Sequence, residues 1–209
     1  LVKNVMTRVE TILKISLEDL PYDLKNCFLH CALFPEDYSI KRRTITRHWI
    51  TAGFINEKEN KTLEEVAEGY LTELVSRSLL QVVKRNHTGR LKCCQVHDII
   101  RLVALNKAGE ECFGKVYDGS GAFSIEHTRR ISIQSGNLQR LIESDATHVR
   151  AIHVFNRYIN IDLMRPILES SNLLLTLDLQ GTRFKMLPTE VFILFNLRYL
   201  GLRYTNIES

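Results

Sequence analysis

The pair His97-Asp98 is the place in this chain best suited to bind an anion, because it opens a short apolar helix after an expected hairpin. A helix N-terminus presents unpaired N–H groups and the positive end of the helix dipole, so it favours a phosphate or another anion. A histidine there adds a donor whose charge depends on pH. The pair predicts a phosphate contact at His97. The plainer alternatives are that His97 only ends a strand and that Asp98 only caps the helix.

Cysteine and histidine side chains raise the question of a zinc site or a nucleophile. Cys94 and His97 lie close in sequence, as do Cys27 and Cys31. Structural zinc usually needs four ligands in two close pairs, and Cys27 and Cys31 fall on the apolar face of an expected helix. A Cys–His nucleophilic pair would lack an evident oxyanion hole and orienting carboxylate. We therefore expect no metal ligand and no catalytic residue.

The composition is that of a globular protein of one large or two small domains, with 209 residues, 44% hydrophobic and 25% charged. The net charge of +4 does not by itself call for nucleic acid. The apolar runs fall short of the ~18 residues of a membrane span, and residues 1–4 lack signal-peptide features. Five cysteines without a secreted spacing predict a reduced, cytoplasmic compartment. We expect the chain to be a piece of a longer protein.

The elements that would position His97 follow from apolar periodicity. Helices are predicted over 7–20, 22–34 and 43–52, a capping box at 62–65 starts a fourth helix, and strands over 80–83 and 91–96 flank a turn at 86–89. A short helix after His97 should turn Ile99, Leu102 and Val103 inward. This order predicts a winged helix, a relative of the helix-turn-helix.

A second pattern follows a glycine-containing junction at 109–121. Leu174-x-x-Leu177-x-Leu179 recurs as Leu197-x-x-Leu200-x-Leu202, a step of 197 − 174 = 23 residues. Val149-x-x-Ile152-x-Val154 fits the same frame, and Thr128-x-x-Ile131-x-Ile133 fits it less well. Steps of ~20–29 residues with this spacing indicate leucine-rich repeats, with one strand per repeat.

Five segments stand out along the chain, namely Ile12–Pro21, Leu24–Tyr38, His48–Ile55, Val96-His97-Asp98 and Leu197–Leu202. In this order they resemble plant intracellular disease-resistance proteins of the coiled-coil, nucleotide-binding, leucine-rich-repeat (NB-ARC-LRR) family. The family usually has Met where this chain has Val96, and both are apolar types. The resemblance implies an α-helical winged-helix domain followed by the start of an α/β leucine-rich-repeat solenoid. Its implied parts are the end of a helical domain (1–21), the winged helix (22–108), a linker (109–124) and the first repeats (125–209).

The resemblance also implies a function in plant defence and innate immunity, including the hypersensitive response. The parent protein would be a switch that is ADP-bound at rest and ATP-bound when active, with His97 on the β-phosphate of ADP and Asp98 orienting its loop. Implied partners are the protein's own nucleotide-binding domain, a pathogen effector or guarded host protein, and further copies on activation. The parent would be cytoplasmic, membrane-associated or nuclear. This chain has no G-x-x-x-x-G-K-[ST] loop, so we expect no nucleotide binding or enzyme activity from it alone.

A winged-helix DNA-binding regulator with a repeat tail is the alternative function. Four glutamates face outward on the expected fourth helix (Glu64, Glu65, Glu68 and Glu73) against Arg77 alone, and a phosphate backbone would repel them. The basic wing residues Lys84, Arg85, Arg90 and Lys92 keep this alternative open. The repeats offer Arg198, Tyr199, Arg203 and Tyr204 to a protein partner or to the winged helix itself.

Overall fold

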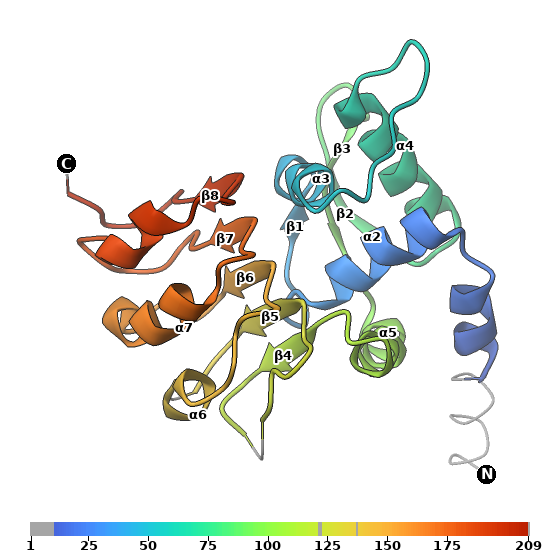
Figure 1. Ribbon diagram of the computed structural model, residues 1–209. Helices are drawn as coiled ribbons and strands as arrows, with labels where there is room; N and C mark the ends of the chain where they lie inside the picture. The colour runs from blue at the N-terminus through green and yellow to red at the C-terminus, as the bar shows by residue number, and fades with distance from the viewer. Residues whose placement is uncertain (1–10, 121–122, 137, 209) are drawn as a thin grey trace. The chain divides into compact units, whose positions relative to one another are not determined.

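The computed structural model describes residues 11–120, 123–136 and 138–208, which form two compact units that divide between Glu110 and Glu111 (Figure 1). Residues 1–4, residues 7–10 of the first expected helix and Gly121 of the expected junction lie outside the described residues. Within the described part, no helix combines the length and apolar character that crossing a membrane requires.

The first unit combines helices with a small antiparallel sheet. Residues 11–18 are helical, and the helices that follow are α2 (Tyr22–Ala32), α3 (Arg42–Thr51), α4 (Leu63–Ser76) and α5 (Asp98–Glu110). The sheet has the order β1-β3-β2, with strands β1 (Ile40–Lys41), β2 (Gln81–Arg85) and β3 (Leu91–Gln95). Strands β2 and β3 form the predicted hairpin, and α5 follows it directly.

Two predicted local motifs of this unit are confirmed. At the start of α4, the Thr62 hydroxyl accepts from the Glu65 backbone N–H at 3.2 Å, and the Glu65 carboxylate accepts from the Thr62 N–H at 2.8 Å. In the hairpin turn, the Asn86 side-chain oxygen accepts from the Thr88 and Arg90 backbone N–H groups at 3.1 and 2.8 Å. Both motifs are local, so short sequence signatures are enough to predict them.

The core of the first unit draws on every helix and on the sheet. Trp49 and Phe28 are 0% exposed, and Leu74 and Cys94 are equally buried. The prediction that Leu102 points inward is wrong, because this side chain is 51% exposed. Helix α5 instead packs against α2 and buries a narrow stripe of Val103, Ala104 and Ala108. Small side chains at that spacing allow close helix packing, which leaves Leu102 on the outer face.

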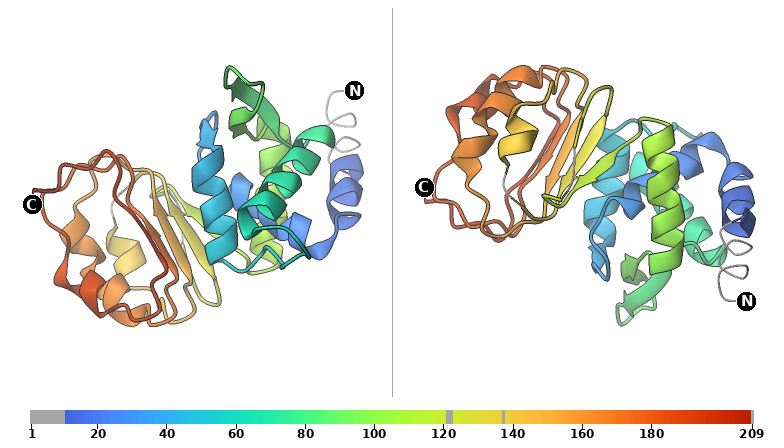
Figure 2. Two further views of the ribbon diagram at one scale, coloured as in Figure 1. Left: turned by 90° about the horizontal axis from the view of Figure 1, so that it is seen from above. Right: turned by 90° about the horizontal axis from the view of Figure 1, so that it is seen from below.

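The second unit is a five-stranded parallel sheet in which each strand pairs with the next along the chain. The strands are β4 (Lys115–Tyr117), β5 (Arg130–Ile133), β6 (Ala151–Val154), β7 (Thr176–Asp178) and β8 (Tyr199–Gly201). The return segments carry α6 (Gln139–Ile142), η1 (Ile161–Met164), α7 (Arg165–Ser170) and η2 (Thr189–Ile193). Figure 2 shows these helical segments on one side of the unit and the strands on the other.

The strand register confirms the alignment of the repeated apolar frames. Ile131 lies opposite Ile152, Ile152 opposite Leu177, and Leu177 opposite Leu200. The first three of these side chains are 0% exposed, whereas Leu200 on the outermost strand β8 is 37% exposed. Each interior strand therefore covers the apolar side chains of its chain neighbours.

Strand β4 lies within residues 109–124, where the sequence suggested a linker. It pairs in parallel with β5, and Tyr117 is 1% exposed. The Tyr117 ring meets Phe123 edge-on, with centroids 4.8 Å apart. This part of the stretch therefore belongs to the sheet. Its strand lacks the repeated leucine frame and is flanked by glycines, which explains why the sequence pattern did not reveal it.

Candidate anion site at the start of helix α5

His97 and Asp98 lie at the junction between strand β3 and helix α5. Both residues are exposed, whereas Val96 before them is buried. The His97 carbonyl accepts from the Arg101 backbone N–H at 2.8 Å, so His97 occupies the cap position and Asp98 begins the helix. The exposed imidazole therefore lies at the positive end of a 13-residue helix, where an anion can reach it.

Arg101 fixes the first turn of α5 to the segment that follows α2. Its Nε–H donates to the Phe34 carbonyl at 2.8 Å. Burial lowers the pKa of the Arg101 guanidinium, and the nearby carboxylates of Glu36 and Asp98 partly offset this effect. Asp98 thus faces both a cation and the helix dipole, which suits a carboxylate in a first turn. Arg101 acts as a positioning residue for the loop that carries His97.

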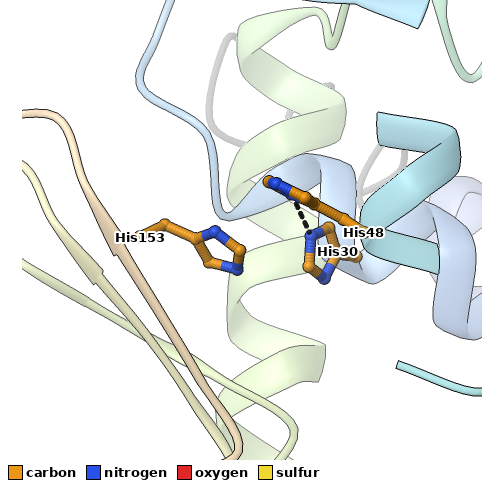
Figure 3. Close-up of side chains that lie close together, drawn as sticks. All are labelled: His30, His48 and His153. Atoms are coloured by element: carbon orange, nitrogen blue, oxygen red, sulfur yellow. Dashed lines mark hydrogen bonds between the residues drawn. The ribbon is translucent and has the colours of Figure 1, made fainter. Parts of the chain in front are cut away.

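A buried histidine pair in the same unit was missed by the sequence reasoning. His30 on α2 and His48 on α3 are 1% and 0% exposed, and His30 Nε2 lies 3.3 Å from His48 Nδ1 (Figure 3). The His30 ring also meets Phe34 and Phe54 edge-on. His153, labelled in the same figure, belongs to strand β6 of the second unit. The available signal was the position of His30 within the apolar stripe of Cys27, Cys31 and Phe34.

The cysteines considered for zinc binding are buried in the first unit as free thiols. They are Cys27, Cys31, Cys93 and Cys94, while Cys112 of the second unit is free and exposed. Burial raises the pKa of the Cys27 and Cys31 thiols well above the ordinary value, and raises that of Cys94 to about 12. Because the thiolate is the metal ligand and the nucleophile, this environment favours a packing role for these three side chains.

Two of the four glutamates of α4 form ion pairs with arginines. Glu68 pairs with Arg42 of α3 and with Arg90 of the wing. Glu73 pairs with Arg77 at 2.8 Å at the end of α4. The remaining pair considered above, Glu64 and Glu65, lies in the exposed first turn of α4, which gives this helix an acidic start.

The helices, the three-stranded sheet and the helix after the hairpin define the first unit as a winged helix. Residues 33–104 match the family described as the winged helix domain of disease resistance proteins. These residues therefore belong to the winged helix family of disease resistance proteins.

Similarity to individual relatives extends over nearly the whole chain. Disease resistance protein RPM1 of Arabidopsis thaliana is 35% identical over 90% of this chain. Disease resistance RPP8-like protein 3 of the same plant is 35% identical over 95%, and Disease resistance protein Pik-2 of Oryza sativa subsp. japonica is 31% identical over 96%. The matched region covers 21%, 23% and 20% of these relatives, so this chain spans about a fifth of their length.

These similarities do not favour the alternative of a DNA-binding regulator. The relatives named above are all disease-resistance proteins. The acidic start of α4 agrees with that result, because phosphate groups would meet Glu64 and Glu65 on this helix.

Proposed function

We propose that this chain is a regulatory segment of a plant immune receptor, and that it couples the nucleotide state of the whole receptor to recognition by repeats. The parent protein would be an ADP/ATP switch in the cytoplasm. Its nucleotide would lie mainly in its own nucleotide-binding domain, and this segment would have no enzyme activity. The match of the winged helix to disease resistance proteins, and the similarity of the chain to them, support the role in immunity.

The observation that carries the nucleotide part of the proposal is the exposed His97 ring at the start of α5. The backbone N–H groups of the first helical turn and the imidazole N–H provide donors suited to a terminal phosphate. Arg101 holds the first turn of α5 to Phe34, which positions the backbone that carries His97. His97 would thus donate to the β-phosphate of ADP, and Asp98 would orient the loop.

The second unit forms, in this proposal, the first repeats of a leucine-rich-repeat solenoid. Support comes from the parallel sheet and from the common frame of Ile131, Ile152, Leu177 and Leu200. Arg198, Arg203 and Tyr204 are exposed, and Tyr199 is half-buried. Aromatic and arginine side chains are frequent in protein interfaces, so these residues suit contact with an effector or a guarded host protein.

The switch would work by a shift between two populations of the parent receptor. Contact of His97 with a nucleotide phosphate would favour the closed form, and contacts on the repeats would favour an open form able to assemble with further copies. Because the two influences act on one equilibrium, loss of the His97 contact should lower the amount of recognition needed for activation.

The test compares His97→Ala with His87→Ala in the full-length receptor. His87 is an exposed histidine in the hairpin turn, so it controls for loss of an imidazole from the same unit. We expect His97→Ala to release ADP faster and to cause activity without a pathogen, while His87→Ala behaves as wild type. The measurements are ADP content and dissociation rate of the purified receptors. Equal ADP retention in the two variants would refute the proposed role of His97.

A further inference from the structure

An arginine-rich pocket lies on the first unit, where helices α3 and α4 meet the wing. It is a pocket of about 180 Å³. Three arginines line it, namely Arg42, Arg85 and Arg90, together with the carboxylate of Glu68. All of these residues belong to the winged helix, and His97 is not among them. The site and its test are independent of the function proposed above.

The side chains that line the pocket carry a net positive charge. Three guanidinium groups and one carboxylate line it, which leaves 3 − 1 = 2 positive charges. Glu68 Oε1 accepts from Arg42, and Glu68 Oε2 accepts from Arg90 Nε at 3.1 Å. Arg85 Nη1 donates instead to the Gly89 carbonyl at 2.9 Å, and within the described residues its guanidinium makes no hydrogen bond to Glu68.

The arginines also act on one another. Burial lowers the pKa of the Arg42 guanidinium, and the neighbouring charges of Arg90 and Arg43 lower it further. A guanidinium carries five N–H donors, and the bonds to Glu68 occupy only part of those of Arg42 and Arg90. The pocket therefore combines surplus positive charge with donors that a second anion can use.

Part of the pocket wall is apolar. Leu71 is 2% exposed, and Val75 and Leu91 are half-buried. A free inorganic anion gains nothing from such a wall, whereas an anion attached to a hydrocarbon or aromatic group buries apolar surface on it. An ester that places phosphate oxygens on the arginines and its organic group on the apolar side chains matches both parts of the lining. Arginine forks suit phosphate because they can donate two parallel hydrogen bonds.

We propose that this pocket binds a phosphate monoester carrying a small apolar group, as in a phosphorylated tyrosine side chain. The phosphate dianion would contact Arg85 and Arg90 beside Glu68, and the organic group would lie on Val75 and Leu91. Glu68 then acts as an internal competitor, because its carboxylate holds two of the three arginines.

The first experiment titrates this chain with phenyl phosphate and follows binding by calorimetry and phosphorus NMR. We expect saturable binding at one site, with an affinity in the millimolar range or tighter, on the order of 4 kcal/mol or more. Benzenesulfonate, which carries a single charge, and inorganic phosphate, which lacks the ring, should bind more weakly. Equal binding of inorganic and phenyl phosphate would refute the ester and leave only a free-phosphate site. The absence of saturable phenyl phosphate binding would overturn the proposal.

Three variants test the location of the site. Arg85→Gln should weaken phenyl phosphate binding about tenfold, since it removes one charged donor. Glu68→Gln should strengthen binding about tenfold, because the internal competitor loses its charge. Arg77→Gln is the matched control, because Arg77 pairs with Glu73 and does not line the pocket. Unchanged binding in Arg85→Gln, or equal loss in Arg77→Gln, would refute the assignment.

A variant that leaves the charges intact guards against misfolding of Glu68→Gln. Leu91→Ala should weaken phenyl phosphate binding severalfold and leave inorganic phosphate binding unchanged, since only the apolar wall is altered. Phosphotyrosine with its amino and carboxyl groups blocked should bind the wild-type chain at least as well as phenyl phosphate does. Its failure to bind would exclude a phosphorylated tyrosine side chain as the ligand.

Discussion

The two units bury their apolar side chains in different ways. In the winged helix, Phe28, Trp49, Leu74 and Cys94 come from α2, α3, α4 and β3, which are far apart in the sequence. In the second unit, buried residues such as Ile152 and Leu177 recur at one position of successive strands. The first core thus depends on long-range contacts, and the second on contacts between chain neighbours.

This difference bears on how each unit presents its functional residues. His97 is held by a contact between α5 and the segment after α2, so its position depends on the fold of the whole winged helix. The exposed residues near β8, such as Arg198 and Arg203, are set by the local strand and its one neighbour. A substitution in the winged helix should therefore affect residues far along the chain, whereas a substitution near β8 should affect mainly its own strand and the neighbouring strand.

The largest effect is expected from Phe28→Ala in the winged helix. Phe28 is 0% exposed, so its truncation should lower the free energy of unfolding of this unit by about 3–5 kcal/mol. Trp49 is the single tryptophan of the chain and is also buried in this unit, so its fluorescence during denaturation reports the loss. A change below about 1 kcal/mol would contradict the view that this core holds the unit together.

In the second unit, Leu177 and Leu200 occupy equivalent positions of successive strands. The substitutions Leu177→Ala and Leu200→Ala therefore compare a buried leucine with a partly exposed one. Leu177 is 0% exposed between β6 and β8, whereas Leu200 is 37% exposed on the outermost strand. The first substitution should cost about 2–5 kcal/mol, and the second about 1 kcal/mol. Urea denaturation followed by circular dichroism measures both. Equal losses of unfolding free energy would show that burial between two neighbouring strands does not control stability in this sheet.

A smaller effect is expected at the capping box of α4. Thr62→Ala should cost about 1 kcal/mol, because the Glu65 backbone N–H loses its acceptor. The measurement is the thermal midpoint of the winged helix, with the exposed turn variant Thr88→Ala as a comparison. A loss at Thr88 as large as that at Thr62 would contradict a specific cap contribution.

The same motif predicts a weak dependence on pH. Backbone and side-chain hydrogen bonds from Thr62 lower the pKa of the Glu65 carboxyl below its ordinary 4.5. A carboxyl whose pKa is depressed in the folded state contributes stability above its unfolded pKa and loses it as pH falls through the folded pKa. Glu65→Gln keeps the box geometry without titrating. The stability of wild type relative to this variant should therefore fall below pH 4.5, and parallel profiles would contradict the prediction.

The rate of thiol modification should differ between the two units of the native chain. Cys112 is exposed in the second unit, whereas the four cysteines of the winged helix are buried. Iodoacetamide should therefore modify Cys112 of the native chain first, and the others only after unfolding. Mass spectrometry of tryptic peptides gives the order, and the Cys112→Ser variant should show no rapid modification. Early labelling of Cys31 or Cys94 would show that the winged-helix core opens readily.

Local chemistry alone determined a large part of this protein. The capping box at Thr62, the turn at Asn86 and the repeated frame around Leu177 each depend on residues close in sequence or on a fixed period. Such signals specify element type and register before any packing is known. The position of His97 at the start of a helix after a hairpin belongs to the same group.

Tertiary structure alone decided the features that join distant segments. Strand β1 contains two residues and exists because it pairs with β3, and His30 meets His48 because α2 packs on α3. The outward direction of Leu102 and the convergence of Arg42 and Arg90 on Glu68 also require the assembled unit. The physical reason is that packing decides which apolar side chains of an element find a neighbour and which charges meet, and the local period of the chain does not specify those partners.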